Sequence, residues 1–244
     1  MALPRFYCPA DLAPRTEIEL PQAVAHHALR VLRLREGQPV ALFDGRGGQY
    51  PATLRIQGQR ALALTGEFDP RETELPGAIT LVQGLPAGEK MDWVIEKAVE
   101  MGVSHIVPIA ARRSVLALEG ARLEKRLARW RSQAVAACEQ SGRNRIPRID
   151  APMGLAQWLA ERPAGSPALL CHPDAAQTLA QALPAPDAAG FCVLVGPEGG
   201  WDEQELREAG RHGVQAVRFG TRVLRTETAG IALVAAACAL LGWE

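Results

Sequence analysis

The sequence predicts an α/β protein whose main domain is a parallel sheet covered by helices, preceded by a small β-rich domain. Beyond residue 77, apolar runs compatible with β-strands alternate with amphipathic helical patterns. Such alternation is typical of a parallel sheet with helices on both faces. Between residues 40 and 68, by contrast, three short β-compatible runs are separated by glycine-containing turns. Short runs of that kind predict the hairpins of a small barrel.

The N-terminal region combines one helical pattern with these β runs. The stretch "AVAHHALRVLRLREG" predicts a helix that stops at Gly37. Its apolar face consists of Val24, His27 or Ala28, Val31 and Leu34. The β runs are "VALFD", "QYPATLRIQ" and "RALALTGEF", and "DPRETELPG" then breaks every periodicity with two prolines. We therefore expect a β-rich domain at 1–70, a linker at 71–77 and an α/β domain at 78–244.

Strands and helices of the second domain follow in turn. Strands are expected at "ITLVQGL", "VSHIVPIA", "ALLCH", "FCVLVG" and "VQAVRFG". Helices are expected at "KMDWVIEKAVEMG", "ARLEKRLARWRSQAVAACEQSG", 175–183 and "DEQELREAGRHG", the last opened by a capping box of Asp202 and Glu205. The final run, "AGIALVAAACALLGW", is apolar nearly all round, so it must be buried on more than one side.

Composition favours an intracellular globular protein. The chain has 244 residues, 48% of them hydrophobic, which is enough for a sizeable core. Its five cysteines are scattered without a C-x-x-C pair, so we expect reduced thiols and no metal site. The first twenty residues do not read as a signal peptide, and the longest apolar run, Ile231 to Leu241, is too short to span a bilayer. We expect a soluble, cytoplasmic protein.

Positive charge is concentrated between Arg112 and Arg148, where ten Lys or Arg accompany three Glu. A solvated helix face and a polyanion site are both compatible with this excess. The stretch "EQSGRNRIPR" carries the charge past the helix into a loop, which favours nucleic acid and makes Arg143 and Arg145 candidate contacts. Further phosphate contacts could come from the N-terminal domain, at Arg5, Arg30 and Arg33.

A glycine-rich loop, "LVGPEGGW", follows a buried strand at the edge where open α/β sheets bind ligands. Gly196, Gly199 and Gly200 allow the backbone to approach a ligand closely. The loop is not a typical phosphate cradle, because no Lys-Ser/Thr follows it and Pro197 lacks an N–H. A tight strand-to-helix turn is the alternative interpretation.

The stretch "RVLRTETAG" is a polar segment between a strand and the last apolar helix. Thr226 or Thr228 could cap that helix, and Glu227 suits the positive end of its dipole. Arg222 and Arg225 remain unexplained, because positive charge is unfavourable at a helix N-terminus. An arginine there needs a partner, either an acidic residue or an anionic substrate.

Taken together, "LVGPEGGW", "FGTRVLRTETA", "KMDWVIEKAVEMGV" and "EQSGR" resemble the SPOUT superfamily of RNA methyltransferases. Within it, the chain is most similar to the bacterial 16S rRNA uracil-N3 methyltransferases. The similarity extends to "PRFYC" and "HHALRVLRLREGQPV", and so covers nearly the whole chain. It implies a PUA-like β-barrel that binds RNA, a SPOUT-type parallel sheet with a C-terminal trefoil knot, and a homodimer.

The resemblance also implies S-adenosyl-L-methionine as cofactor and assigns the residues of its site. The catalytic candidates are Arg225, which would stabilise a uracil anion, and Glu227, as proton acceptor or as a clamp for Arg225. Three loops are implied to bind the cofactor: Leu170 and His172; Val195, Gly196, Pro197, Glu198, Gly199 and Gly200; and Phe219, Gly220, Val223, Leu224, Arg225, Thr226, Thr228 and Ala229.

The implied activity is methylation of N3 of a specific uridine in 16S rRNA of the small ribosomal subunit. One alternative is a SPOUT 2′-O-ribose methyltransferase acting on rRNA or tRNA, which product analysis would distinguish. Another is a non-catalytic RNA-binding factor of ribosome assembly, which need not bind the cofactor.

Overall fold

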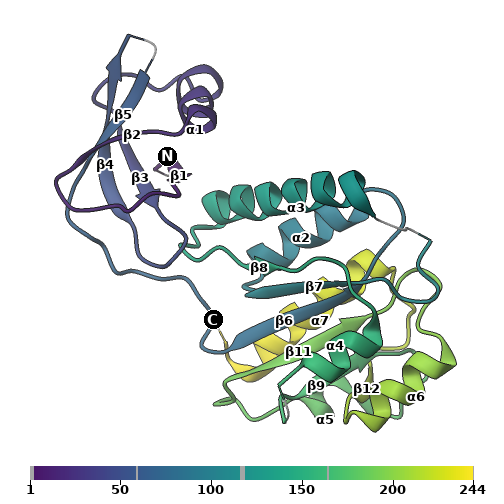
Figure 1. Cartoon of the computed structure of the whole chain (residues 1–244). Coiled ribbons are helices and arrows are strands. Elements are labelled where there is room, and N and C mark those ends of the chain that lie inside the picture. The colour runs from purple at the N-terminus through teal and green to yellow at the C-terminus, as the bar shows by residue number, and fades with distance from the viewer. Residues whose placement is uncertain (1–2, 59, 116–118, 164, 244) are drawn as a thin grey trace. The chain divides into compact units, whose positions relative to one another are not determined.

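The computed structural model describes residues 3–58, 60–115, 119–163 and 165–243 (Figure 1). The chain folds into two compact units. The first comprises Met1–Glu74 with Val135–Ile146, and the second comprises Leu75–Ala134 with Pro147–Glu244. The first unit therefore ends within the expected linker, and it also includes a segment that the sequence pattern had placed in the second domain.

The first unit is built on a five-stranded sheet of order β1-β3-β4-β5-β2. Its strands are β1 (Arg5–Tyr7), β2 (Glu17–Glu19), β3 (Pro39–Phe43), β4 (Tyr50–Gln57) and β5 (Arg60–Thr65). The three β runs expected from the sequence form β3, β4 and β5, which pair antiparallel, whereas β1 pairs parallel with β3. Phe6, Leu42 and Leu54 are fully buried in the core beneath this sheet.

The helix of this unit departs from the expected pattern. It begins as α1 (Gln22–His26) and continues as a π-helical turn, η1 (His27–Val31), in which the Leu32 amide donates to the His27 carbonyl at 2.9 Å. A π turn admits one more residue than an α turn, so it rotates the following side chains out of the α-helical register. The placement of Val31 on the apolar face was therefore wrong: Val31 is 60% exposed.

Residues 135–146 join the first unit because their polar side chains bond within it. The Tyr7 amide donates to Glu139 at 2.9 Å, and Arg5 donates to Asn144 at 2.6 Å. Arg143 is 3% exposed and forms a two-pronged ion pair with Glu74, its Nη2 lying 2.5 Å from Oε2. The sequence pattern had assigned the charge of Arg143 to the surface, but these bonds hold it inside the first unit. The expectation that Arg143 contacts RNA was therefore wrong.

The second unit contains a seven-stranded sheet of order β10-β12-β9-β11-β6-β7-β8. Its strands are β6 (Ala78–Gly84), β7 (His105–Ile109), β8 (Arg148–Ile149), β9 (Ala168–Cys171), β10 (Gln177–Thr178), β11 (Gly190–Val195) and β12 (Gln215–Arg218). Every pairing between neighbours is parallel, which confirms the predicted parallel sheet. The expected trefoil knot stays a prediction.

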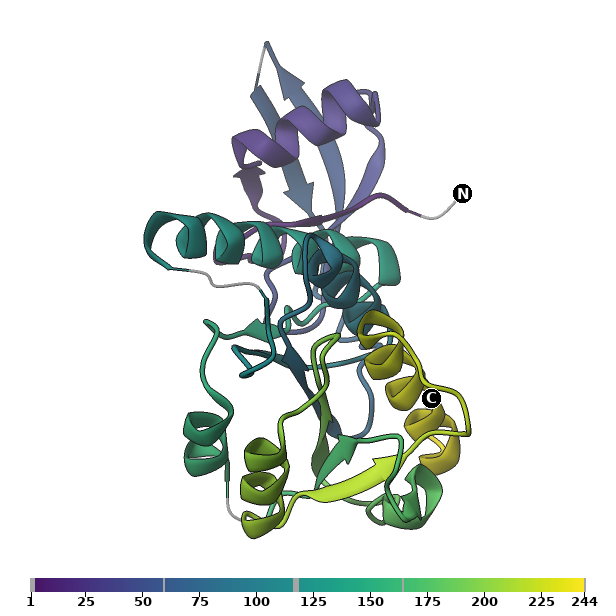
Figure 2. The same cartoon turned by 90° about the vertical axis from the view of Figure 1, so that its right-hand side faces the viewer.

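Helices lie on both faces of this sheet, as Figure 2 shows. They are α2 (Lys90–Glu100), α4 (Leu155–Glu161), α5 (Leu179–Ala182), α6 (Glu203–Arg211) and α7 (Thr226–Leu241); α3 (Gly120–Ser141) links the second unit to the segment that joins the first. On one face α4 packs against α6, and on the other α7 packs against α2, α5, β6 and β11. The predicted capping box is confirmed, since Asp202 and Glu205 accept reciprocal amide hydrogen bonds.

The apolar helix α7 is buried on one side by the other elements of its own unit. Leu233, Val234 and Ala237 are all 0% exposed, beneath α2 and the sheet. The sequence required burial on more than one side, and the packing of α7 against the sheet and two helices covers one of them. No helix among the described residues is sufficiently long and apolar to cross a lipid bilayer.

Candidate functional site

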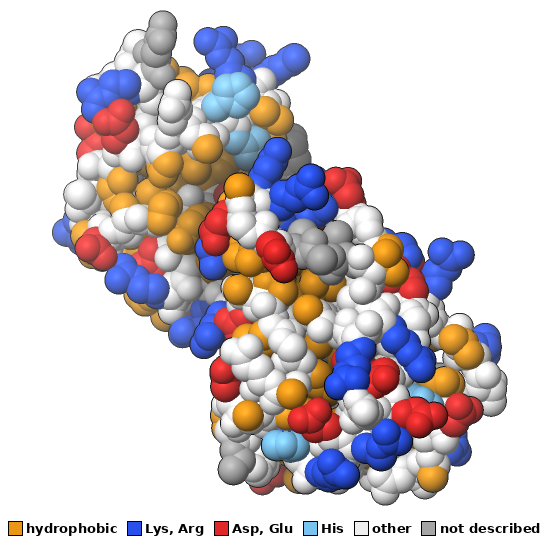
Figure 3. All heavy atoms as spheres, turned by 45° about the vertical axis from the view of Figure 1, so that its right-hand side comes forward, with side chains coloured by type: hydrophobic (Ala, Val, Ile, Leu, Met, Phe, Trp, Pro, Cys, Tyr) orange, Lys and Arg blue, Asp and Glu red, His pale blue; other side chains and the backbone are white. Residues whose placement is uncertain are grey.

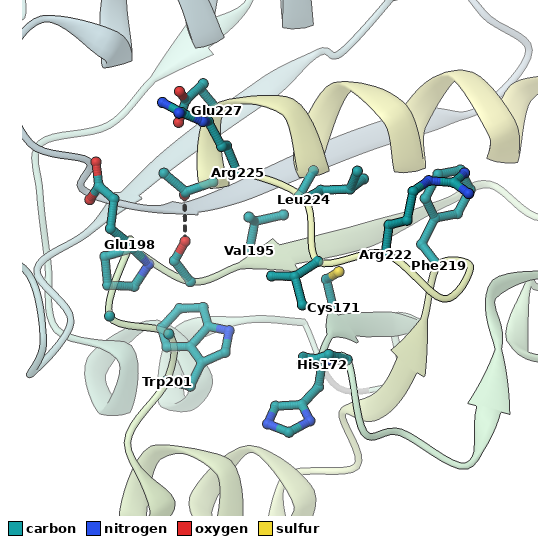
Figure 4. Close-up of a pocket in the computed structure, with 18 of the residues that line it drawn as sticks. Cys171, His172, Val195, Glu198, Trp201, Phe219, Arg222, Leu224, Arg225 and Glu227 are labelled. Carbon is teal, nitrogen blue, oxygen red and sulfur yellow. Dashed lines mark hydrogen bonds between the residues drawn. The ribbon is translucent and has the colours of Figure 1, made fainter.

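A cavity of about 770 Å³ lies at the carboxyl ends of β9, β11 and β12 (Figure 4). The loops that follow these strands form its walls, because parallel neighbours all end at the same edge of the sheet. It is lined by all the cofactor residues expected from the sequence except two. Leu170 is 2% exposed and packs in the core, whereas the next two residues, Cys171 and His172, line the cavity. Thr228 lies exposed on the first turn of α7.

Thr226 ties the two main walls together. Its hydroxyl donates to the Gly196 carbonyl at 2.5 Å, the dashed line in Figure 4, and accepts from the Gln83 side-chain amide at 2.9 Å. The hydroxyl does not cap α7, whose N-cap residue is Arg225 and has no side-chain cap. The interpretation of Thr226 or Thr228 as a cap was therefore wrong, because the hydroxyl of Thr226 is committed to the opposite wall.

The glycine-rich loop approaches the end of β6 very closely. A Cβ atom placed on Gly84 would lie 2.5 Å from the backbone nitrogen of Pro197, a distance that no side chain tolerates. A Cβ atom on Gly199 would lie 3.0 Å from Arg113, whose guanidinium donates to the Gly199 carbonyl at 3.0 Å. Backbone rather than side chains therefore forms this wall, which leaves room for a ligand to approach it.

Three charged side chains cluster beside Thr226. The Lys90 ammonium donates to Glu198 at 2.7 Å and lies 3.6 Å from Oε2 of Glu227. The Ala87 amide also donates to both carboxylate oxygens of Glu198, at 3.1 and 3.2 Å. Glu227 is at the positive end of α7, in the first turn of the helix. A cation and two anions thus join the start of α2, the glycine-rich loop and α7.

These contacts shift two pKa values. The hydrogen bond to Glu198 raises the pKa of Lys90 above its ordinary value. Burial raises the pKa of Glu198, but the hydrogen bonds from Lys90 and from the backbone outweigh that effect and leave the pKa below its ordinary value. Both groups are therefore held in their charged forms at neutral pH.

The lowered pKa of Glu198 predicts an acid-dependent loss of stability. A carboxyl group with a lower pKa in the folded state stabilises the fold above its unfolded pKa, about 4.3, and this contribution is lost as the pH falls through the folded pKa. The urea midpoint of the wild type should therefore fall more between about pH 5 and pH 3 than that of Glu198→Gln. Glu203→Gln is the control, because Glu203 is an exposed carboxylate on α6. Equal acid sensitivity of wild type and Glu198→Gln would contradict the assignment.

Arg225 and Glu227 extend in the same direction at one end of the cavity, whereas Arg222 lies at the other end beside Phe219 (Figure 4). Arg225 is exposed, and Glu227 keeps 18% of its side chain accessible. Within the described part of the chain, the Arg225 guanidinium has no hydrogen-bond or ion-pair partner. The structure thus presents an uncommitted guanidinium next to a carboxylate.

Sequence reasoning missed several lining residues, namely Lys90, Arg113, Cys171, Pro173, Trp201, Arg218 and Thr221. Lys90 was detectable, because it follows the carboxyl end of β6 and β6 is the direct neighbour of β11. Arg113 carried no such signal, since its role depends on a long-range bond to Gly199. Within the described ranges of the sequence, no group of three or more His, Cys, Asp or Glu is arranged to hold a metal ion.

The other expected RNA contacts, all in the first unit, separate into three kinds. Arg5 donates to Gln49, to the Arg143 carbonyl and to Asn144, so its guanidinium is used internally. Arg145 is 57% exposed and lies 3.4 Å from Glu72. Arg30 and Arg33 are exposed on and just after the η1 turn. Arg145 is thus on the surface but paired, whereas Arg30 and Arg33 are on the surface and have no ion pair within the described residues.

Comparison with known proteins identifies the class of this fold and site. The family model described as an RNA methyltransferase domain matches residues 73–238, and that of the RNA methyltransferase PUA domain matches residues 20–62. The chain is therefore an RNA methyltransferase by family, with a PUA domain before the α/β domain.

Individual relatives show to which family of RNA methyltransferases the chain belongs. The ribosomal RNA small subunit methyltransferase E of Mycobacterium bovis is 34% identical over 89% of this chain and 85% of its own length, and that of Bacillus subtilis is 29% identical over 84% and 82%. The crystal structure of a ribosomal RNA small subunit methyltransferase E from Neisseria gonorrhoeae, bound to S-adenosyl methionine, is 38% identical, covers 98% of both chains and superposes with a TM-score of 0.91. The chain belongs to the ribosomal RNA small subunit methyltransferase E family, which confirms the resemblance seen in the sequence.

Proposed function

We propose that this protein uses S-adenosylmethionine to methylate N3 of a specific uridine in 16S rRNA of the small ribosomal subunit, in the cytoplasm. The observation that carries the proposal is the cavity at the carboxyl ends of β9, β11 and β12, formed by the loops that the sequence assigned to the cofactor. The relative from Neisseria gonorrhoeae, which matches over 98% of this chain, is described as bound to that cofactor.

The cavity has the size and the walls that such a cofactor needs. Its volume of about 770 Å³ falls in the range of roughly 300 to 1,000 Å³ typical of small-molecule sites. Backbone of the glycine-rich loop would contact the cofactor on one side, and Leu224 to Thr226 with Ala229 on the other. When bound, S-adenosylmethionine supplies a methyl group that its sulfonium has already activated.

The protein must therefore mainly create the nucleophile. Uracil N3 carries a proton at neutral pH, and its lone pair becomes available only when that proton leaves. Glu227 is the proposed proton acceptor, with Lys90 3.6 Å away to hold it in place. Arg225 is the proposed cation that stabilises the negative charge developing on the uracil carbonyl oxygens.

Two measurements test the function, one on cells that lack the protein and one on the purified wild type. Mass mapping of modified nucleosides should show that 16S rRNA from cells lacking the protein has lost one N3-methyluridine, and calorimetry should show binding of S-adenosylmethionine. Loss of a methylated ribose instead would indicate a 2′-O-methyltransferase. Unchanged rRNA modification, together with no cofactor binding, would indicate an RNA-binding factor without catalysis.

We also propose a homodimer that uses the exposed side of α7. Val234 and Ala237 are buried within the protomer, so a charge at either position would disrupt the fold of the protomer and would not test an interface. The exposed side instead carries Ala235, Ala239 and Leu240, and Leu240 is 57% exposed. Because a charge buried at an interface without a partner is costly, Leu240→Glu should shift the protein toward monomer in sedimentation velocity. A wild type that sediments as a monomer at micromolar concentration would refute the dimer.

A further inference from the structure

Charged side chains of both signs are interspersed on the face of the second unit that Figure 3 shows. Inside this unit polar side chains are few, and among its described residues Gln83, Asp92, Glu205 and Thr226 are buried. Asp92 forms an ion pair with Arg129, and Glu205 belongs to the capping box of α6. Gln83 and Thr226 instead bond to each other, next to the cavity that Thr226 lines.

The Gln83 amide can bond to Thr226 in one orientation only. Its Nε2 atom donates to the Gly84 carbonyl at 3.0 Å as well as to the Thr226 hydroxyl at 2.9 Å. A carbonyl only accepts, so the rotated amide would place two acceptors, Oε1 and the Gly84 oxygen, against each other. The Thr226 oxygen thus receives a proton from Gln83 and has its own proton to donate to the Gly196 carbonyl, 2.5 Å away. Gln83 therefore sets the direction of the hydrogen bond that joins the two walls.

This orientation leaves the other end of the amide without a partner. Oε1 of Gln83 is buried and accepts no hydrogen bond from the described residues. Helix α7 comes close to it at Gly230, where a Cβ atom would lie 3.4 Å from Oε1 and 3.1 Å from Leu81. An unpaired buried acceptor destabilises the folded state, whereas an apolar side chain of similar length would not. Stability of the fold alone thus does not account for an amide at position 83.

We propose that Gln83 is a positioning residue for methyl transfer: by orienting the Thr226 hydroxyl, it holds the first turn of α7 at a fixed distance from the glycine-rich loop. Thr226 is flanked in the chain by Arg225 and Glu227, the two proposed catalytic residues. The loop that begins at Gly196 would bind the cofactor. Gln83 is fully buried and is not one of the described residues that line the cavity, so it acts through Thr226. The inference rests on the proposed function, which makes the cavity a cofactor site.

Removal of the amide tests this role. Gln83→Met keeps the length of the side chain and removes both its donor and its unpaired acceptor. This variant should bind S-adenosylmethionine about 5- to 10-fold more weakly in calorimetry, the loss expected for about one hydrogen bond. Methyl transfer at saturating RNA and cofactor should also slow about 10-fold, because Arg225 and Glu227 lose their alignment with the cofactor. The urea midpoint should stay close to that of the wild type, which separates a positioning role from a structural one.

A double-mutant cycle tests whether Gln83 acts through Thr226. Thr226→Val keeps the shape of the side chain and removes the hydroxyl, so it should weaken the binding of S-adenosylmethionine as well. The variant that carries both substitutions should bind no more weakly than Thr226→Val alone, since without the hydroxyl the amide has nothing to orient. Independent contributions would multiply instead, and that result would overturn the proposal.

Thr80→Val is the control, because it removes a hydroxyl from the same strand, β6, three residues before Gln83. Its cofactor affinity and its turnover should match those of the wild type. Wild-type affinity of Gln83→Met, or failure of both Gln83→Met and Gln83→Leu to fold, would also show the proposal to be wrong. A wild type that binds S-adenosylmethionine without methylating RNA would contradict the proposed function, and the cycle on cofactor affinity would still decide whether Gln83 positions the wall of the cavity.

Discussion

Arg225→Ala is expected to lower the turnover number at least about 100-fold, because removing a single donor that stabilises a developing anion typically costs that much. The affinity for S-adenosylmethionine should change little. Only the backbone of Arg225 takes part in the fold, where its carbonyl accepts the amides of Thr228 and Ala229 at the start of α7. Its side chain is exposed, so truncation leaves the walls of the cavity in place.

Single-turnover kinetics at saturating RNA, paired with calorimetry of cofactor binding, would measure the two effects separately. Arg222→Ala is the matched control, because it removes an exposed arginine from the same loop at the opposite end of the cavity (Figure 4). If Arg225→Ala keeps near wild-type turnover, Arg225 does not stabilise the uracil anion, and Lys90, the cation that lies beside Glu227, becomes the candidate for that role. Arg143 cannot take this role, since it is buried against Glu74 in the first unit.

Gly84→Ala is expected to destabilise the protein by about 3 kcal/mol or more, in the range of severe overpacking. The added Cβ atom would lie 2.5 Å from the Pro197 nitrogen and 2.8 Å from the Gly196 carbonyl carbon. Both contacts are with backbone, so no side chain can rotate away to relieve them. The glycine-rich loop must shift instead, and cofactor binding should be lost together with stability.

Gly210→Ala provides the comparison within the same unit. Gly210 lies in α6, and a Cβ atom there would meet nothing within 4 Å. Because alanine is the better helix former, this variant should be stabilised by about 0.5–1 kcal/mol. Urea denaturation measures both variants. A Gly84→Ala protein that is as stable as the wild type and still binds the cofactor would show that the close approach is not required.

The parallel sheet was predictable because it depends on local patterns, whereas the residues of the cavity were assigned from the resemblance to a known family. Alternating apolar strands and helices indicate which segments form the sheet, and all parallel strands of one sheet end at the same edge. The loops after β9, β11 and β12 therefore lie at one edge of the sheet, and the observed strand order β12-β9-β11 makes them neighbours. The exact side chain could still be wrong by one position, as it was at Leu170, where the alternation of strand side chains turns Cys171 toward the cavity instead.

Features that depend on distant partners were not predictable from local pattern. Arg143 looked like part of a basic surface, because nothing nearby in sequence shows that Glu74 is its partner. Thr226 resembled a helix cap, since its bonds to Gly196 and Gln83 cross long stretches of chain. The exposure of Val31 depends on a π turn, which the 3.6-residue periodicity does not reveal. In each case tertiary contacts or irregular backbone overrode a reasonable local assignment.

The hydroxyl of Thr226 connects residues that are synthesised far apart in time. Its partner Gln83 precedes it by 143 residues, at the end of the strand that is made first in the α/β unit, whereas Thr226 opens the last helix. During translation the early strands can begin to pair before that helix has been made. The walls of the cavity can therefore be tied together only after Thr226 has been made, and a chain truncated before α7 lacks that bond.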